Sequence, residues 1–291
     1  IAGQNNYETF FERLIWNKFH ILPDEISAPW LGTRLAKESS SFMRKFGWLE
    51  GGESSVLYKL AEYLKEHGVK IFTGANIYKI ENSEKKKRIY FMNGTKQEVI
   101  EADAVVSTIA PRVFLKLAPN ISKEIKDKME KIKYLSCSCL TVGLNKKFTD
   151  RYWINILEKD VPVSAIFCRS NLYEDSAPNG KSVMYIITYM KHGEEFWFKS
   201  EDEIKKAYID YAERIFPGFR QAIEWERLAK LEWVEAIYDM DYENPPITDG
   251  NGFYFAGIYR FFPKIRNVAS ALESGIEAAE KIIEDDGSKS P

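Results

Sequence analysis

Apolar residues recur at helical spacing in two segments of the first seventy residues. One stripe indicates that residues 7–46 are mainly helical. It consists of Phe10, Phe11, Leu14, Ile15 and Phe19. A second stripe follows Gly51 and Gly52, and it consists of Val56, Leu57, Leu60, Ala61 and Leu64. Gly68 lies just beyond this stripe, where a glycine commonly ends a helix, so we expect a helix between Gly52 and Gly68.

Shorter apolar runs up to residue 111 predict strands. Residues 69–72 form the first run, and residues 77–80 alternate apolar and polar side chains. Residues 104–106 are a buried-type strand that ends in a turn at 107–111, because a proline disfavours helix at the residue before it. The basic run at 85–88, followed by Asn93-Gly94, predicts a polar hairpin.

The middle of the chain is rich in strands. Residues 134–190 contain several apolar strand-like runs, and residues 229–239 form a further one. Two helices flank them. Residues 122–133 are a charged amphipathic helix, and Ser200 with Glu203 forms a capping box that starts a helix over 201–215.

The C-terminal block pairs a strand with a helix. The strand 253–256 runs into Gly257, and a polar loop with Arg260, Lys264 and Arg266 follows. A helix then opens near Asn267-Val268 with small residues on one face: Ala271, Gly275, Ala278 and Ala279. An open helix N-terminus after such a turn can bind an anion or a carbonyl group. A strand and helix that only cap an α/β domain would give the same local pattern.

These blocks together resemble the C-terminal portion of the FAD-dependent amine oxidase, protoporphyrinogen oxidase and phytoene desaturase superfamily. The resemblance rests on GWLEGG with its helix (47–64), on ADAVVSTIAP (102–111) and on GFYFAGIYR with its helix (252–284). It extends over nearly the whole chain, through ISAPWLGTRLA, YWINIL and MYIITYM, to a protoporphyrinogen-oxidase-like branch distantly akin to UDP-galactopyranose mutase. One departure is Ile258, where the family usually carries an acidic residue.

The resemblance implies FAD as cofactor and a set of positions that contact it. These are Gly51, Gly52, Ile77, Thr108, Ile109, Gly257, Ile258, Asn267 and Val268. It also implies an α/β fold, mixed with α+β features, in which a partial Rossmann-like FAD-binding layer is interleaved with a substrate domain of mixed sheet and helices. We expect the layer at 48–111 and 253–284, the substrate domain at 1–46 and 112–245, and a disordered tail at 285–291.

The family's GxGxxG loop, which holds the FAD pyrophosphate, does not occur in the sequence. We therefore expect these residues to be the C-terminal part of a longer protein, or one half of a split protein. The nucleotide-binding half would be a missing N-terminal segment or a partner subunit. The chain alone would bind FAD weakly and be inactive, and its exposed apolar surface would favour association, for instance as a homodimer.

Composition removes several classes of function. The formal net charge is -2, so the composition lacks the excess of basic residues typical of nucleic-acid-binding proteins. No apolar run is long enough for a transmembrane helix, and we expect a cytoplasmic location. Three cysteines are too few for a disulfide framework, and Cys137 and Cys139 share one strand face as buried thiols rather than metal ligands. We expect no metal.

Flavin oxidases often need no strong acid or base, because the cofactor takes the hydride. The candidate residues around the substrate are Trp153, Asn155, Arg169, Tyr185, Tyr189, Tyr259, Arg260 and Arg34. Each has an ordinary core or surface role as its alternative. Three functions are open: an oxidoreductase acting on a small organic molecule, a sugar-nucleotide isomerase in which Arg34, Arg169 and Arg260 converge, and a non-catalytic subunit that binds a partner.

Overall fold

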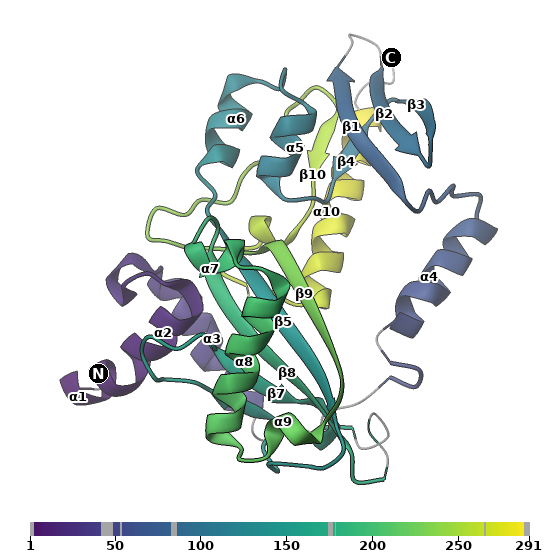
Figure 1. Ribbon diagram of the computed structural model, residues 1–291. Helices are drawn as coiled ribbons and strands as arrows, with labels where there is room; N and C mark the ends of the chain where they lie inside the picture. Colours follow the sequence, from purple (N-terminus) through teal and green to yellow (C-terminus); the bar gives the residue numbers. More distant parts are fainter. Residues whose placement is uncertain are drawn as a thin grey trace. The chain divides into compact units, whose positions relative to one another are not determined.

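The computed structural model describes residues 3–41, 49–52, 54–82, 86–173, 177, 179–264 and 266–287 (Figure 1). The chain divides into two compact units, each built from separated stretches of sequence. The first unit comprises Ile1–Leu31 and Lys133–Tyr242, and the second comprises Gly32–Ile132 and Glu243–Pro291. Both units mix helices with open sheets, which confirms the expected α/β fold class.

The first unit contains a five-stranded antiparallel sheet in the order β6-β7-β8-β5-β9. Its strands are β5 (Tyr134–Leu144), β6 (Trp153–Asn155), β7 (Ala165–Cys168), β8 (Ser182–Lys191) and β9 (Ile223–Ala236). The strand-rich middle of the chain is therefore confirmed. The last strand begins at Ile223, six residues before the position expected from the sequence.

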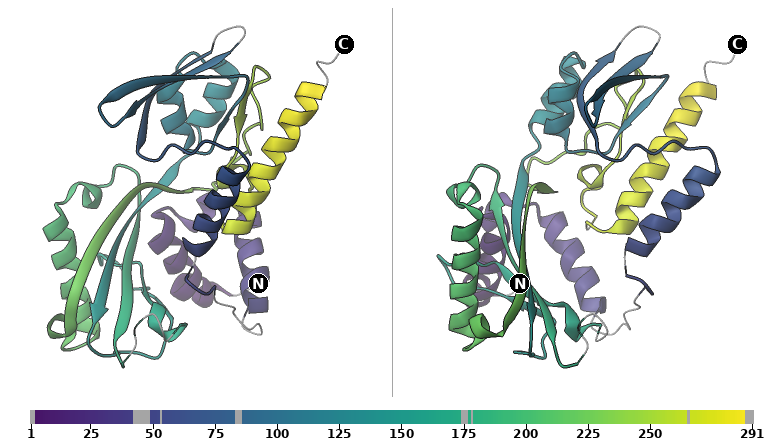
Figure 2. Two further views of the ribbon diagram at one scale, coloured as in Figure 1. Left: turned by 90° about the vertical axis from the view of Figure 1, so that its right-hand side faces the viewer. Right: turned by 45° about the vertical axis from the view of Figure 1, so that its right-hand side comes forward.

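One face of this sheet packs against α8 (Glu201–Ile215) and α9 (Phe219–Ala222) (Figure 2). Alternate residues such as Leu140, Val142 and Ile186 point into this core. Tyr208 of α8 is fully buried there, and its hydroxyl is hydrogen-bonded to Ser138 of β5. The capping box is confirmed, because Ser200 Oγ accepts from the Glu203 N–H and the Glu203 carboxylate accepts from the Ser200 N–H.

The N-terminal helices belong to the first unit up to Leu31. They are α1 (Gln4–Asn6), the π-helical η1 (Tyr7–Phe11), α2 (Glu12–Phe19), the 3₁₀ turn η2 (Pro23–Glu25) and the start of α3 (Ala28–Ser41). Ile15 and Phe19 of the predicted stripe are buried, whereas Phe10 is 45% exposed. Two further short elements are η3 (Arg169–Asn171) and α7 (Glu195–Phe198).

The second unit holds an antiparallel three-stranded sheet and a parallel strand pair. Its strands are β1 (Ala75–Asn82), β2 (Lys87–Asn93), β3 (Lys96–Ala102), β4 (Val105–Ser107) and β10 (Phe253–Phe255). Its helices are α4 (Ser54–Glu66), α5 (Pro111–Leu117), α6 (Lys123–Glu130), η5 (Ile258–Arg260) and α10 (Val268–Gly287). The predicted hairpin at Asn93-Gly94 joins β2 and β3, and Gly94 has the positive φ of 60° that such a turn requires.

Several expected boundaries differ from the structure. Residues 69–72 are not a strand; none of the sheets in the described part of the chain includes them, and a strand forms only where a neighbour completes its hydrogen bonds. Residues 112–132 cluster with the second unit, because Phe114 of α5 packs edge-on against Phe253 and Phe255 at 5.4 and 5.2 Å. The helix α10 includes residues 285–287 of the predicted tail, and residues 288–291 lie outside the described residues.

None of the described helices is both long enough and apolar enough to span a membrane.

Candidate functional site

The parallel pair of β4 and β10 brings two predicted cofactor segments to one edge of the second unit. Phe255 pairs with Ser107, and the Ala256 N–H donates to the Ser107 carbonyl at 3.0 Å. Because parallel strands end on the same side, Thr108 and Ile109 leave the sheet beside Gly257 and Ile258. The two segments lie about 150 residues apart in sequence, and the strand pairing brings them together.

Glycine at position 257 is required by the turn itself. Gly257 has φ 148° and ψ 162°, a region that is essentially restricted to glycine. A Cβ at this position would lie 2.7 Å from Cε1 of Tyr259, whose ring folds back over the turn. Tyr259 is only 3% exposed, and its burial raises the pKa of its hydroxyl. The turn therefore packs against a buried tyrosine.

The buried side chain of Arg260 stabilises the same turn through hydrogen bonds to backbone carbonyls. Its Nη1 donates to the Phe255 carbonyl at 3.1 Å, and its Nε donates to the Pro245 carbonyl at 3.3 Å. The Arg260 side chain is 10% exposed, and burial lowers its pKa although Glu277 lies 3.9 Å away. These contacts give Arg260 a structural role at the end of β10.

The start of α10 is where the sequence predicts it. Val268 is 72% exposed at the first turn, and the Asn267 Oδ1 accepts from the Ser270 N–H at 2.8 Å. The N-terminus is thus partly capped by Asn267 rather than fully open. Of the small residues noted in the sequence, Ala278 is among those that α10 buries. Ser270, Ser274 and Ala278 are buried, whereas Ala271, Gly275 and Ala279 face outward.

The glycine pair before α4 forms a tight turn. Gly51 and Gly52 have φ 78° and 76°, and the Gly52 carbonyl accepts hydrogen bonds from the N–H and the hydroxyl of Ser55. Ile77 lies in β1 at the start of a β-bulge and is 40% exposed. A bulge re-aims the local backbone groups, so the strand is irregular at the predicted contact.

In the first unit, the sheet face opposite α8 gathers four of the candidate residues; we call it the open face. One row of directly paired residues crosses all five strands, and the next row runs parallel to it. The aromatic row consists of Trp153, Phe167, Tyr185, Thr141 and Arg227. The small row consists of Asn155, Ala165, Ile187, Cys139 and Ala229. Tyr189 lies two residues beyond Ile187 on the same face.

Two features of the open face have no signature in the sequence. A Cβ at Gly143 would overlap the Trp225 indole, so this glycine allows Trp225 to lie across β5. Lys18 of α2 forms an ion pair with the fully buried Glu235 of β9 at 3.1 Å. No local sequence pattern predicts this pair, because the two residues lie far apart in the chain and are brought together by the packing of α2 against the sheet.

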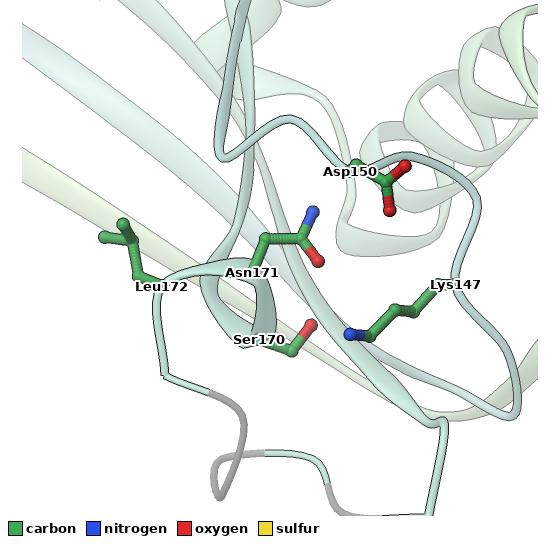
Figure 3. A pocket seen from close by; sticks show the side chains of 5 residues that line it. All are labelled: Lys147, Asp150, Ser170, Asn171 and Leu172. Atoms are coloured by element: carbon green, nitrogen blue, oxygen red, sulfur yellow. The ribbon is translucent and has the colours of Figure 1, made fainter.

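The remaining arginine candidates lie elsewhere. Arg169 follows β7 in η3, and the surface hollow beside it has a volume of about 310 Å³ (Figure 3). The hollow is lined by Lys147, Asp150, Ser170, Asn171 and Leu172. The side-chain amide of Asn171 donates to the Thr149 and Arg151 carbonyls, so local loop contacts explain the position of this side chain. Arg34 lies within α3, and its side chain is outside the described part of the structure.

Comparison with known proteins gives one match to a family model and many structural likenesses. A 4,4'-diapolycopen-4-al dehydrogenase from Metabacillus indicus is 27% identical over 203 residues, which is 62% of this chain and 39% of that protein. A reduced UDP-galactopyranose mutase has a TM-score of 0.75 at 15% identity, over 97% of this chain and 66% of that one. An oxidoreductase from Methanosarcina mazei has a TM-score of 0.71 at 16% identity, over 96% and 65%.

The two structural likenesses show the fold, and this chain spans less than two thirds of the length of each protein named above. The family is shown by the sequence match, which extends from residue 7 to residue 283. It covers both units, including the β4–β10 pair and the open face. The chain therefore belongs to the family of flavin containing amine oxidoreductases.

Proposed function

We propose that this chain supplies the substrate domain and part of the FAD-binding domain of an oxidoreductase that removes hydride from a small organic molecule. The observation that carries the proposal is the β4–β10 pair, whose ends bring Thr108 and Ile109 beside Gly257 and Ile258 within a chain of this family. When bound, the flavin would accept the hydride.

The residues at this edge fit the ring of a flavin. Thr108 and Ile109 are exposed, so their backbone groups are accessible beside the turn. Val268 is exposed at the start of α10, where backbone N–H groups and the helix dipole favour negative charge. In this proposal Thr108, Ile109, Gly257, Asn267 and Val268 hold the ring. Ile258, in place of an acidic residue, supplies no carboxylate contact.

The pyrophosphate of FAD would be held by residues outside these 291. The second unit exposes apolar side chains of a kind that a further segment or partner subunit would cover. They include Val56, Leu57, Leu60 and Tyr63 of α4, Leu272 and Ile276 of α10, and Val69 and Phe72 of the segment 69–72 that follows α4. Their number supports a missing contact surface, and a homodimer is the alternative use of the same surface.

The open face of the first unit is the proposed substrate wall. Trp153, Asn155, Tyr185 and Tyr189 share this face, and the opposite face is filled by the α8 core. These side chains would orient the substrate and exclude water from it, without a strong acid or base among them.

The isomerase alternative needs arginines that converge on a pyrophosphate. Arg260 is occupied by the carbonyls of Phe255 and Pro245 in the second unit, which counts against this role. We therefore rank the oxidoreductase first.

An absorbance experiment on the protein together with its upstream segment or partner tests the proposal. The oxidoreductase is supported if the purified protein carries a flavin spectrum that bleaches with substrate and returns with oxygen or a quinone. A flavin that turns over a sugar nucleotide only after prior reduction would favour the isomerase. A colourless preparation that binds no added FAD would reject both and leave the partner-binding subunit.

A further inference from the structure

A charged pair lies near one end of β5 on the open face, where Glu235 of β9 pairs with Leu135, four residues along β5 from Cys139 of the small row. Lys18 Nζ is 3.1 and 3.3 Å from the two carboxylate oxygens of Glu235. The Glu235 side chain is fully buried, whereas that of Lys18 is 20% exposed. Burying a carboxylate carries a large desolvation penalty, and a well-packed apolar pair is often at least as stable. Fold stability therefore gives no evident reason for this pair.

Three aromatic rings surround the Lys18 ammonium. Its Nζ lies 5.2 Å from the ring centroids of Phe19 and Trp30 and 5.7 Å from that of Tyr189. Such rings attract a cation and lower the local dielectric constant, which strengthens any hydrogen bond that the ammonium donates. Tyr189 belongs to the open face, so the ammonium lies at the end of that face.

The body of the open face extends away from Lys18 along β8. Ile187, Cys139 and Ala165 follow Tyr189, and the tilted pair of Phe167 and Trp153 lies beyond them with ring centroids 5.2 Å apart. Four residues along a strand separate Tyr189 from Tyr185, a distance of about 14 Å. This length suits an extended apolar body rather than a compact amine.

We infer that Lys18, held in place by Glu235, binds an acceptor oxygen at one end of an extended apolar substrate whose body lies along β8, past the half-buried Cys139 towards Tyr185. The complementarity is between the partly exposed ammonium and a carbonyl or carboxylate oxygen. The inference rests on the proposed function, because it names the class of molecule that the substrate wall takes. Glu235 is a positioning residue that acts through Lys18.

Binding of two fluorescent polyenes to the purified protein tests this inference without flavin. cis-Parinaric acid carries a carboxylate, and diphenylhexatriene carries no oxygen. Replacing Lys18 alone would leave Glu235 buried without its partner, so the variant is the double change Lys18→Met with Glu235→Leu. We expect it to weaken cis-parinaric acid binding about tenfold or more and to change diphenylhexatriene binding less than about twofold. Lys18→Arg keeps a donor and should bind cis-parinaric acid within about threefold of wild type.

Thiol protection locates the body of the probe. Cys139 is half-buried on the open face, whereas Cys168 is buried in the α8 core and serves as the internal reference. Bound cis-parinaric acid should slow alkylation of Cys139 by N-ethylmaleimide and leave Cys168 unaffected. Equal binding of cis-parinaric acid to wild type and the double variant, or unprotected Cys139, would overturn the inference. Because no step needs FAD, a protein that binds the probe as expected but lacks flavin would refute only the proposed function.

Discussion

Replacing Gly257 by alanine tests the turn that joins β10 to η5. The backbone at φ 148° and ψ 162° lies in a region that costs a non-glycine residue roughly 1–3 kcal/mol. The new Cβ would also lie 2.7 Å from the Tyr259 ring, and overpacking of this kind costs about 1–3 kcal/mol. The sum predicts that Gly257→Ala loses about 2–6 kcal/mol of stability in urea unfolding followed by tryptophan fluorescence.

A second glycine in the same unit is the matched control. Gly275 lies in α10, and a Cβ there would meet nothing within 4 Å. Alanine is a better helix former than glycine by about 1 kcal/mol, so Gly275→Ala should unfold at the same or a slightly higher urea concentration. The reasoning about the turn fails if Gly257→Ala unfolds at the wild-type midpoint. A double-mutant cycle with Tyr259→Leu separates the two contributions, because only the ring contact is coupled to Tyr259.

Three further outcomes are expected. The Glu213 carboxylate accepts hydrogen bonds from the backbone N–H groups of Arg220 and Gly218, both at 2.7 Å, and these bonds hold the pKa of the carboxyl below its ordinary value. Glu213→Gln should therefore lower the melting temperature at neutral pH. The difference between variant and wild type should vanish as the pH falls through the lowered pKa. Leu57 and Leu272 are 67% and 56% exposed. The double variant Leu57→Lys with Leu272→Lys should therefore reduce the self-association of the chain measured by light scattering. A wild-type chain that is already monomeric would contradict the apolar contact surface. Titration of FAD into the 291-residue chain alone should give weak or no fluorescence quenching, and tight stoichiometric binding would show that the pyrophosphate site lies within these residues.

Local sequence patterns predicted much of the secondary structure. The Ser200–Glu203 cap, the hairpin at Gly94 and the apolar run that forms β8 depend on neighbours a few residues apart, and all are present in the structure. The prediction for 69–72 is wrong because a short apolar run does not reveal whether a partner strand exists. The residues that α10 buries have no clear signature in the sequence, since Ser270 and Ser274 are small enough to pack although their polarity suggests exposure.

The candidate site was foreseen only in part. The resemblance pointed to Gly257 and Thr108, and strand pairing brings their segments together. The pair of Lys18 and Glu235 depends on contacts across 217 positions, which no local spacing encodes. Arg260 looked available in the sequence because its carbonyl partners, Phe255 and Pro245, belong to the backbone and leave no side-chain signature.

The reduction potential of the bound flavin in a Val268→Trp variant tests the central claim most directly. The claim is that the start of α10 lies against the flavin ring, so an indole at this 72% exposed position should lower flavin content or shift the potential. Ile283→Trp is the matched control, since Ile283 is 71% exposed on the same helix and lies about 22 Å further along it. A changed potential or content in Val268→Trp alone would support the account. Wild-type flavin content, spectrum and potential in Val268→Trp, measured in the protein with its nucleotide-binding half, would contradict it.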